Sequence, residues 1–194
     1  MFVVCARHAQ GNNTGQRPLG SRRHTVDANP VIDVLNAARA RELAVIIQYM
    51  EHHYVAAGTE GLPSFFRQSK GDMWVSGHGT GVAAKLFGAP DAVVTLKAVA
   101  KVEMLHAQRF GHRVTALGGV PTVTPGERCK ASSVREMLEF DVAAEEEAVT
   151  TYTDAIEVCR SAGDDESRAL FERILLDERA HRAAFLDLLG KDGS

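Results

Sequence analysis

The chain has 194 residues, of which 45% are hydrophobic and 24% charged, and its formal net charge is −3 at pH 7. These values are ordinary for one soluble globular domain with a substantial core. The net charge argues neither for nor against a nucleic-acid or membrane partner for the whole chain, but no apolar run approaches the ~20 residues that span a bilayer.

The location of the protein is predicted from its N-terminus and its cysteines. Met1–Ala6 is apolar but too short for a signal-peptide core, and no basic region precedes it. Cys5, Cys129 and Cys159 are odd in number and form no Cys-x-x-Cys pair, so a zinc knuckle is not indicated and a reducing compartment is the simplest interpretation. We therefore expect a cytoplasmic protein without a membrane partner.

Residues 1–28 are predicted to form a flexible arm. Gly, Asn, Gln and Ser fill much of this segment, which is typical of a polar tail. Four arginines precede the first acidic residue, so a DNA-binding arm and a targeting segment are the alternatives. These arginines are Arg7, Arg17, Arg22 and Arg23.

The first helix is expected to begin at Asn29-Pro30, because Asn is a good N-cap and Pro suits the first helical position. Gly58 is its predicted stop. Glycines and prolines then interrupt the pattern as far as Pro90, which predicts a long irregular insertion over residues 58–90. Apolar residues recur at helical spacing along the first helix: Val31, Leu35, Ala38, Leu43, Ile46, Ile47 and Met50.

The second helix is predicted from about Asp91 to Leu117, because Gly118-Gly119 and Pro121 follow it. A polar loop then leads to the third helix.

The last two helices complete an all-α fold. Ser133–Glu136 fits a capping box that opens the third helix, Gly163 ends it, and Asp164 or Asp165 caps the fourth. No convincing β-strand alternation is present. Four long amphipathic helices predict an antiparallel four-helix bundle over residues 29–190.

Two of these helices carry charged residues where a core should be apolar. Glu103-x-x-His106 and Glu178-x-x-His181 are the only Glu-x-x-His strings in the chain. Residues three apart on a helix share a face, so the carboxylate and imidazole of one string can meet a single metal ion.

The other two helices each offer one matching acid among apolar neighbours. Burying four carboxylates without cations is prohibitive, because each desolvated charge costs several kcal/mol and like charges repel. Oxygen and nitrogen donors together suit iron or manganese, with zinc as a common substitute. The predicted ligands of a two-metal centre are Glu42, Glu103, His106, Glu145, Glu178 and His181.

The helices that carry these residues resemble bacterioferritin, within the ferritin-like superfamily. The resemblance implies a di-iron ferroxidase that oxidises Fe(II) with oxygen or peroxide, for iron storage or detoxification. The resembling segments are Glu42–Tyr49, Glu103–Arg109, Leu117–Pro121, Met137–Glu145 and Ile174–His181.

The resemblance also implies individual roles. Tyr49 would lie beside the metals and donate a hydrogen bond or an electron, although it can also be a plain core aromatic. Met104 stands where bacterioferritins ligate haem, although methionine is also a routine packing residue. The implied metal ligands are Glu42 and His106 for one iron, Glu145 and His181 for the other, and Glu103 and Glu178 as bridges.

Three other histidines are assigned outside the ligand set. His52 and His53, late in the first helix, are expected at the surface, and His112, nearly two turns beyond His106, is a candidate outer partner of the metal centre.

The chain departs from the bacterioferritin pattern in its arm, its insertion 58–90 and its end at Ser194, which leaves no room for the short fifth helix of the family. A large storage shell is therefore not expected. We expect a homo-oligomer, either a dimer or a larger assembly such as that of DNA-protecting mini-ferritins.

Three alternative functions fit the same ligands. A di-iron oxidase or oxygenase would act on an organic substrate in a pocket shaped by the insertion. A non-enzymatic iron-binding or DNA-protecting subunit would use the arginine arm. A catalase-like manganese enzyme is the third.

Overall fold

The computed structural model describes residues 29–60 and 91–191, so the predicted arm and the insertion beyond its first three residues lie outside the described residues. These two stretches form helices and contain no strand, which confirms the all-α prediction. The helices are α1 (Pro30–Glu60), α3 (Asp91–Ala116), α4 (Val134–Ser161) and α5 (Asp165–Lys191).

The first helix begins where the sequence predicts and ends later. The side-chain oxygen of Asn29 accepts hydrogen bonds from the backbone N–H groups of Val31 at 3.0 Å and Ile32 at 3.4 Å. The helix continues through Gly58 to Glu60, so the predicted stop at Gly58 is wrong. A glycine only weakens a helix and does not end it by itself.

The last two helices have side-chain caps. Ser133 Oγ accepts from the N–H of Glu136 at 3.2 Å, as a capping box requires. The Glu136 carboxylate, however, accepts from the N–H of Ser132 at 2.6 Å, so the reciprocal half of the box is displaced by one residue. The cap of α5 is Asp164, whose carboxylate accepts from the N–H of Ser167 at 2.9 Å.

The turn between α4 and α5 depends on Gly163, which has a φ of +69°. Replacing Gly163 by alanine should lower the free energy of unfolding by about 1–2 kcal/mol, because a Cβ is disfavoured in the left-handed region. Gly190 is the matched control, since it lies inside α5 with no atom within 4 Å of an added Cβ. There alanine should be neutral or slightly stabilising. Urea denaturation measures both; equal effects would contradict the argument.

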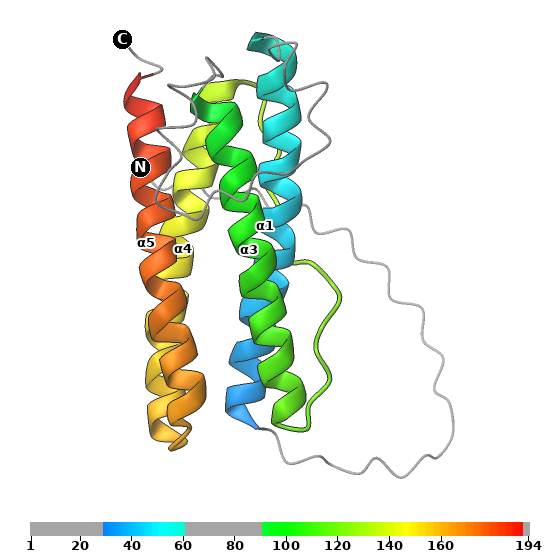
Figure 1. Ribbon diagram of the computed structural model, residues 1–194, viewed down its shortest axis with the longest axis vertical. Helices are drawn as coiled ribbons and strands as arrows, with labels where there is room; N and C mark the ends of the chain where they lie inside the picture. The colour runs from blue at the N-terminus through cyan, green and yellow to red at the C-terminus, as the bar shows by residue number, and fades with distance from the viewer. Residues whose placement is uncertain (1–28, 61–90, 192–194) are drawn as a thin grey trace, which may run out of the picture.

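The helices form two antiparallel pairs, α1 with α3 and α4 with α5 (Figure 1). The loop over residues 117–133 follows α1 along its length. Near its start, the N–H of Thr122 donates to Asn36 Oδ1 at 2.8 Å, and near its end, the N–H of Cys129 donates to Gln48 Oε1 at 3.3 Å. This crossover makes α3 and α4 run in the same direction, as in ferritin-type connectivity.

The core consists of two apolar clusters with a polar layer between them. One contains Phe110, Tyr152 and Phe171, and the other contains Leu96 and Phe185. The six predicted metal ligands occupy the layer between these clusters and fill inward positions of all four helices.

The polar layer changes which apolar side chains of α1 face inward. Ile47 is 40% exposed, whereas Glu42 and Tyr49 are fully buried. The regular apolar spacing through Ile47 therefore does not mark one buried stripe.

Two further predictions concern location. Within residues 29–60 and 91–191, no helix combines the length and apolar character needed to cross a membrane. Cys159 is free and buried.

Candidate metal centre

The six predicted ligands come together in the middle of the bundle. All are buried, five of them completely, with His181 9% exposed. They form two groups whose potential ligand atoms lie within 4.8 Å of one another, and both groups contain Glu103 and Glu178. The groups are Glu42, Glu103, His106 and Glu178, and Glu103, Glu145, Glu178 and His181.

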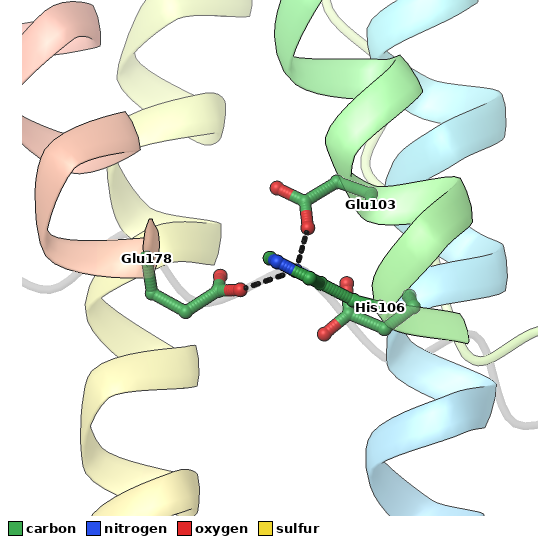
Figure 2. Close-up of side chains that lie close together, drawn as sticks. Glu103, His106 and Glu178 are labelled. Carbon is green, nitrogen blue, oxygen red and sulfur yellow. Dashed lines mark hydrogen bonds and ion pairs between the residues drawn. The ribbon is translucent and has the colours of Figure 1, made fainter. Parts of the chain in front are cut away.

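The imidazole of His106 lies between carboxylates from α3 and α5 (Figure 2). Its Nδ1 is 2.7 Å from Glu103 Oε2 and 3.0 Å from Glu178 Oε1. Its Nε2, on the other side of the ring, is 3.2 Å from Asp177 Oδ2. The Nδ1 of His181 lies 2.8 Å from Glu103 Oε1. Both histidines thus direct Nδ1 towards the glutamates.

Within the described part of the chain, several of these buried atoms have no hydrogen-bond partner. His181 Nδ1 and Glu103 Oε1 are close, but their relative orientation does not make a hydrogen bond. Buried carboxylate oxygens and imidazole nitrogens without partners are unfavourable unless a cation completes them. This donor set fits two divalent metal ions. The unpartnered ligand atoms are Glu42 Oε2, Glu103 Oε1, Glu145 Oε2, both Glu178 oxygens and His181 Nδ1.

Two tyrosines bind the two glutamates that belong to only one group each. The Tyr49 hydroxyl donates to Glu145 Oε1, and the Tyr152 hydroxyl donates to Glu42 Oε1. Both tyrosines are fully buried. Each hydrogen bond leaves the second oxygen of its glutamate without a partner, and that oxygen is available to a metal ion.

Sequence reasoning missed three residues of this centre. Tyr152 could have been predicted from the sequence, because it lies seven residues after Glu145, just as Tyr49 lies seven residues after Glu42. Asp177 directly precedes a predicted ligand, but its partner is on another helix. Arg41, whose Nη1 is 3.7 Å from both Glu42 Oε2 and Glu178 Oε2, had no signal in the sequence.

The protonation of the carboxylates reflects burial and neighbouring charge. Burial and the charge of Glu103 raise the pKa of Glu42 to about 8 and that of Glu178 to about 7. Burial and the charge of Glu178 raise the pKa of Glu145 as well. Burial also disfavours charge on Glu103, but the adjacent imidazoles of His181 and His106 outweigh it and hold its pKa well below the usual range.

The imidazole of His106 is also perturbed. Burial lowers its pKa, but hydrogen bonds to Asp177 and Glu103 and the nearby carboxylate of Glu178 more than compensate and raise the pKa to about 12. Without metal ions, the centre therefore holds protons on some carboxyls and on this imidazole.

The expectation that His52 and His53 lie at the surface is wrong. His52 and His53 are 2% and 7% exposed, not at the surface. His52 Nδ1 lies 2.9 Å from Asp141 Oδ1, and His53 Nδ1 lies 2.8 Å from the carbonyl of Val93. His112 is exposed, so it is not an outer partner of the ligands.

Met104 is half exposed, whereas Glu103 and His106 on the same helix are fully buried. It borders a hollow of about 350 Å³ that Leu43 and Ile46 also line. Met104 therefore faces away from the metal ligands. Haem binding at Met104 stays a prediction.

Comparisons with known proteins agree with this geometry. Residues 90–193 match a family described as Ferritin-like domain. A bacterioferritin of Desulfovibrio desulfuricans is 34% identical over 152 residues, which cover 78% of this chain and 69% of that protein. A nutrient stress-induced DNA-binding protein of Nostoc is 28% identical over 172 residues, covering 81% and 77%.

A solved structure provides a further comparison. The structure of the Desulfovibrio desulfuricans bacterioferritin, which concerns its diiron site in different catalytic states, aligns with a TM-score of 0.64 and 31% identity. The alignment covers 83% of this chain and 78% of the other.

Proposed function

The chain belongs to the ferritin-like superfamily, with bacterioferritins among its relatives, and on this premise we propose that it binds Fe(II) as its substrate and oxidises it to Fe(III). The observation that carries the proposal is the pair of buried ligand groups that share Glu103 and Glu178. Their unpartnered atoms point to two cations close together. Manganese and zinc suit the same donors, and metal analysis of the purified protein distinguishes the three.

We assign the ligands by the groups to which they belong. Glu103 and Glu178 would bridge the two ions, because both groups contain them. Each ion also receives one glutamate and one histidine of its own. These are Glu42 and His106 for one ion, and Glu145 and His181 for the other.

The reaction that this arrangement supports is a two-electron reduction of oxygen or peroxide. Two Fe(II) ions each lose one electron; oxygen with two protons then gives hydrogen peroxide, and peroxide with two protons gives two waters. The four carboxylates stabilise the higher charge of the ferric product, and the two imidazoles hold the geometry.

Tyr49 and Tyr152 would position the glutamates of the separate ions through their hydroxyl groups. We also propose that Tyr49 can supply one of the two electrons when a single Fe(II) is oxidised: Fe(II) and the Tyr49 hydroxyl group each lose one electron, the hydroxyl also loses its proton, and oxygen takes up both electrons with two protons to give hydrogen peroxide. Tyr49→Phe should then remove a tyrosyl radical signal from rapid-freeze electron paramagnetic resonance, whereas Tyr152→Phe, the matched control, should keep it. The same signal in both variants would exclude this role for Tyr49.

Anaerobic titration with Fe(II), followed by oxygen and absorbance monitoring, tests the proposed function. We expect two Fe(II) per chain and a rapid ferric signal. Continued oxidation with much more iron retained would indicate storage, whereas arrest near two ions would indicate detoxification or an oxidase. The proposal fails if no stoichiometric Fe(II) binding occurs.

Asp177 should support metal binding without touching the metal. It accepts a hydrogen bond from His106 Nε2, which leaves Nδ1 to face the glutamates. Replacing Asp177 by asparagine should weaken Zn²⁺ binding by roughly 10–100-fold, the usual effect of losing such an outer partner. Titration calorimetry measures it, with Asp187→Asn on the same helix as control. Equal affinities for the Asp177 variant and the wild type would show that this contact does not contribute.

A second candidate function is DNA protection. It is favoured by the similarity to a relative named as a DNA-binding protein and by the arginines predicted to lie in the arm. Deleting residues 1–26 should abolish salt-sensitive DNA binding in a gel-shift experiment if this function is present. Binding that survives the deletion would exclude the arm as the DNA contact.

We also propose that the chain forms a homo-oligomer through α1 and α3. Exposed apolar side chains on these helices support this proposal: Ile47, Tyr54, Val55 and Met104 are 40–65% exposed. Light scattering coupled to size-exclusion chromatography tests it. A monomeric mass at micromolar concentration would contradict it.

A further inference from the structure

Arg41 lies between the candidate metal centre and a groove on the outside of the bundle. The groove has a volume of about 1160 Å³, and α1 and α4 provide much of its lining. The Arg41 side chain is only 13% exposed, although it belongs to the groove lining. Its Nη2 donates to the carbonyl of Ala144 on α4, and its guanidinium lies 5.7 Å from the centre of the Tyr152 ring.

The guanidinium supplies positive charge to the carboxylates without forming hydrogen bonds to them. Nη1 is 3.7 Å from Glu42 Oε2 and from Glu178 Oε2, which is too long for a hydrogen bond. Nη1 and Nε have no hydrogen-bond partner in the described residues. Whenever Glu42 or Glu178 is ionised, the contact is therefore a charge–charge attraction in a buried setting, where such attraction is strong.

This position conflicts with the binding of two divalent cations. Metal ions between the glutamates would lie a few ångströms from the guanidinium charge and repel it. The side chain already lines the groove, where Glu127 and Glu147 provide negative charge, while Glu146 in the same lining pairs with Arg182. Among the described residues its one hydrogen bond is to the carbonyl of Ala144, so outward movement would break that bond and the contact with the Tyr152 ring.

We propose that Arg41 is a built-in counter-ion, which neutralises the carboxylates of the metal-free centre and turns outward into the groove when metal ions bind. This inference rests on the proposed metal-binding function. It adds that the Arg41 guanidinium competes with the metal ions for the carboxylates. Arg41 is a positioning residue: it sets the affinity of the glutamates for metal without binding metal itself.

A purely structural role for Arg41 makes a different prediction. If the hydrogen bond to Ala144 only ties α1 to α4, its loss should destabilise the metal-free and metal-loaded protein equally. A counter-ion stabilises the metal-free protein alone, and its removal strengthens metal binding.

The first test compares wild type, Arg41→Gln and Arg41→Lys by thermal unfolding, with and without Zn²⁺, and by Zn²⁺ titration calorimetry. We expect Arg41→Gln to lower the unfolding temperature of the chelator-treated protein only and to increase Zn²⁺ affinity by about tenfold or more. Arg41→Lys, which keeps the charge, should restore the wild-type values. Arg182→Gln is the matched control, because Arg182 lines the same groove but pairs with Glu146 at 2.6 Å.

The outcomes separate this inference from the proposed function. Equal destabilisation with unchanged affinity, or weaker Zn²⁺ binding in Arg41→Gln, would overturn the counter-ion role while the metal site stands. Absence of Zn²⁺ and Fe(II) binding in the wild type would overturn both.

The second test needs no variant. Phenylglyoxal modifies accessible arginines, and peptide mass spectrometry locates the modification. In the wild-type chain, modification of Arg41 should be slow without metal and several-fold faster with Zn²⁺ bound, whereas that of Arg182 should not change. A slower reaction of Arg41 in the presence of Zn²⁺ would contradict its outward movement.

Discussion

Replacing Glu103 by alanine should abolish the binding of both metal ions. Glu103 belongs to both ligand groups, and its two oxygens approach the Nδ1 atoms of His106 and His181. Losing an outer partner of a ligand weakens metal binding by roughly 10–100-fold. The loss of a ligand shared by both ions should therefore lower the affinity for each ion by more than this factor. Titration calorimetry with Zn²⁺, and anaerobic titration with Fe(II), measure the stoichiometry.

Glu42 and Glu145 provide the matched comparison, because each belongs to one group only. Alanine at either position should reduce the stoichiometry from two ions per chain to one. All three glutamates are fully buried, so a general effect of removing a buried acid would be shared by the three variants. If Glu103→Ala keeps one tightly bound ion, Glu103 does not bridge the two.

Metal affinity should rise steeply with pH between pH 6 and pH 8. Metal ions must displace protons from Glu42 and Glu178, whose pKa values are raised to about 8 and about 7 in the metal-free protein. Each displaced proton contributes up to about tenfold per pH unit below the pKa, so the affinity should change by on the order of 10–100-fold from pH 6 to pH 7. Zn²⁺ titrations in buffers with different ionisation enthalpies measure both the affinity and the protons released.

The stability of the metal-free protein should change in the opposite direction. The pKa values of Glu42 and Glu178 lie above the ordinary carboxyl value of 4.5, so the folded protein binds more protons than the unfolded chain. Their contribution to stability is complete below that value and is lost as the pH rises through 7 and 8. The raised pKa of His106 acts in the same direction.

Thermal unfolding of chelator-treated protein at several pH values measures this loss. Glu42→Gln should flatten the pH dependence, because it removes one titrating group. A metal-free protein that becomes more stable from pH 6 to pH 8 would contradict the assignment of raised pKa values.

Much of the fold was predictable because its signals are local. The cap at Asn29 and the glycine after α4 depend on neighbouring backbone groups, and the structure confirms both. The course of the loop over residues 117–133 was not predictable. Its direction along α1 depends on hydrogen bonds such as that from Thr122 to Asn36, between residues 86 positions apart.

The residues of the candidate site also divide into those that the local sequence predicts and those whose partners lie on another helix. The Glu-x-x-His strings could be predicted from the sequence, because both residues of a string lie on one turn of a helix. The environment of His52 was not, because its partner Asp141 is on another helix. Arg41 also escaped notice, because arginine is usually a surface residue and only the assembled bundle brings it beside the carboxylates.

The bundle can be regarded as two helical hairpins, α1–α3 and α4–α5, that carry the same set of polar residues. Each hairpin carries a lone glutamate, a tyrosine seven residues later and a Glu-x-x-His string. Each tyrosine binds the glutamate of the opposite hairpin, and each ligand group takes residues from both. Metal ions bound in these two groups would therefore hold the two hairpins together. The contact plane between the hairpins should be the first region to exchange amide hydrogens when the ions are removed, and the last when they are bound.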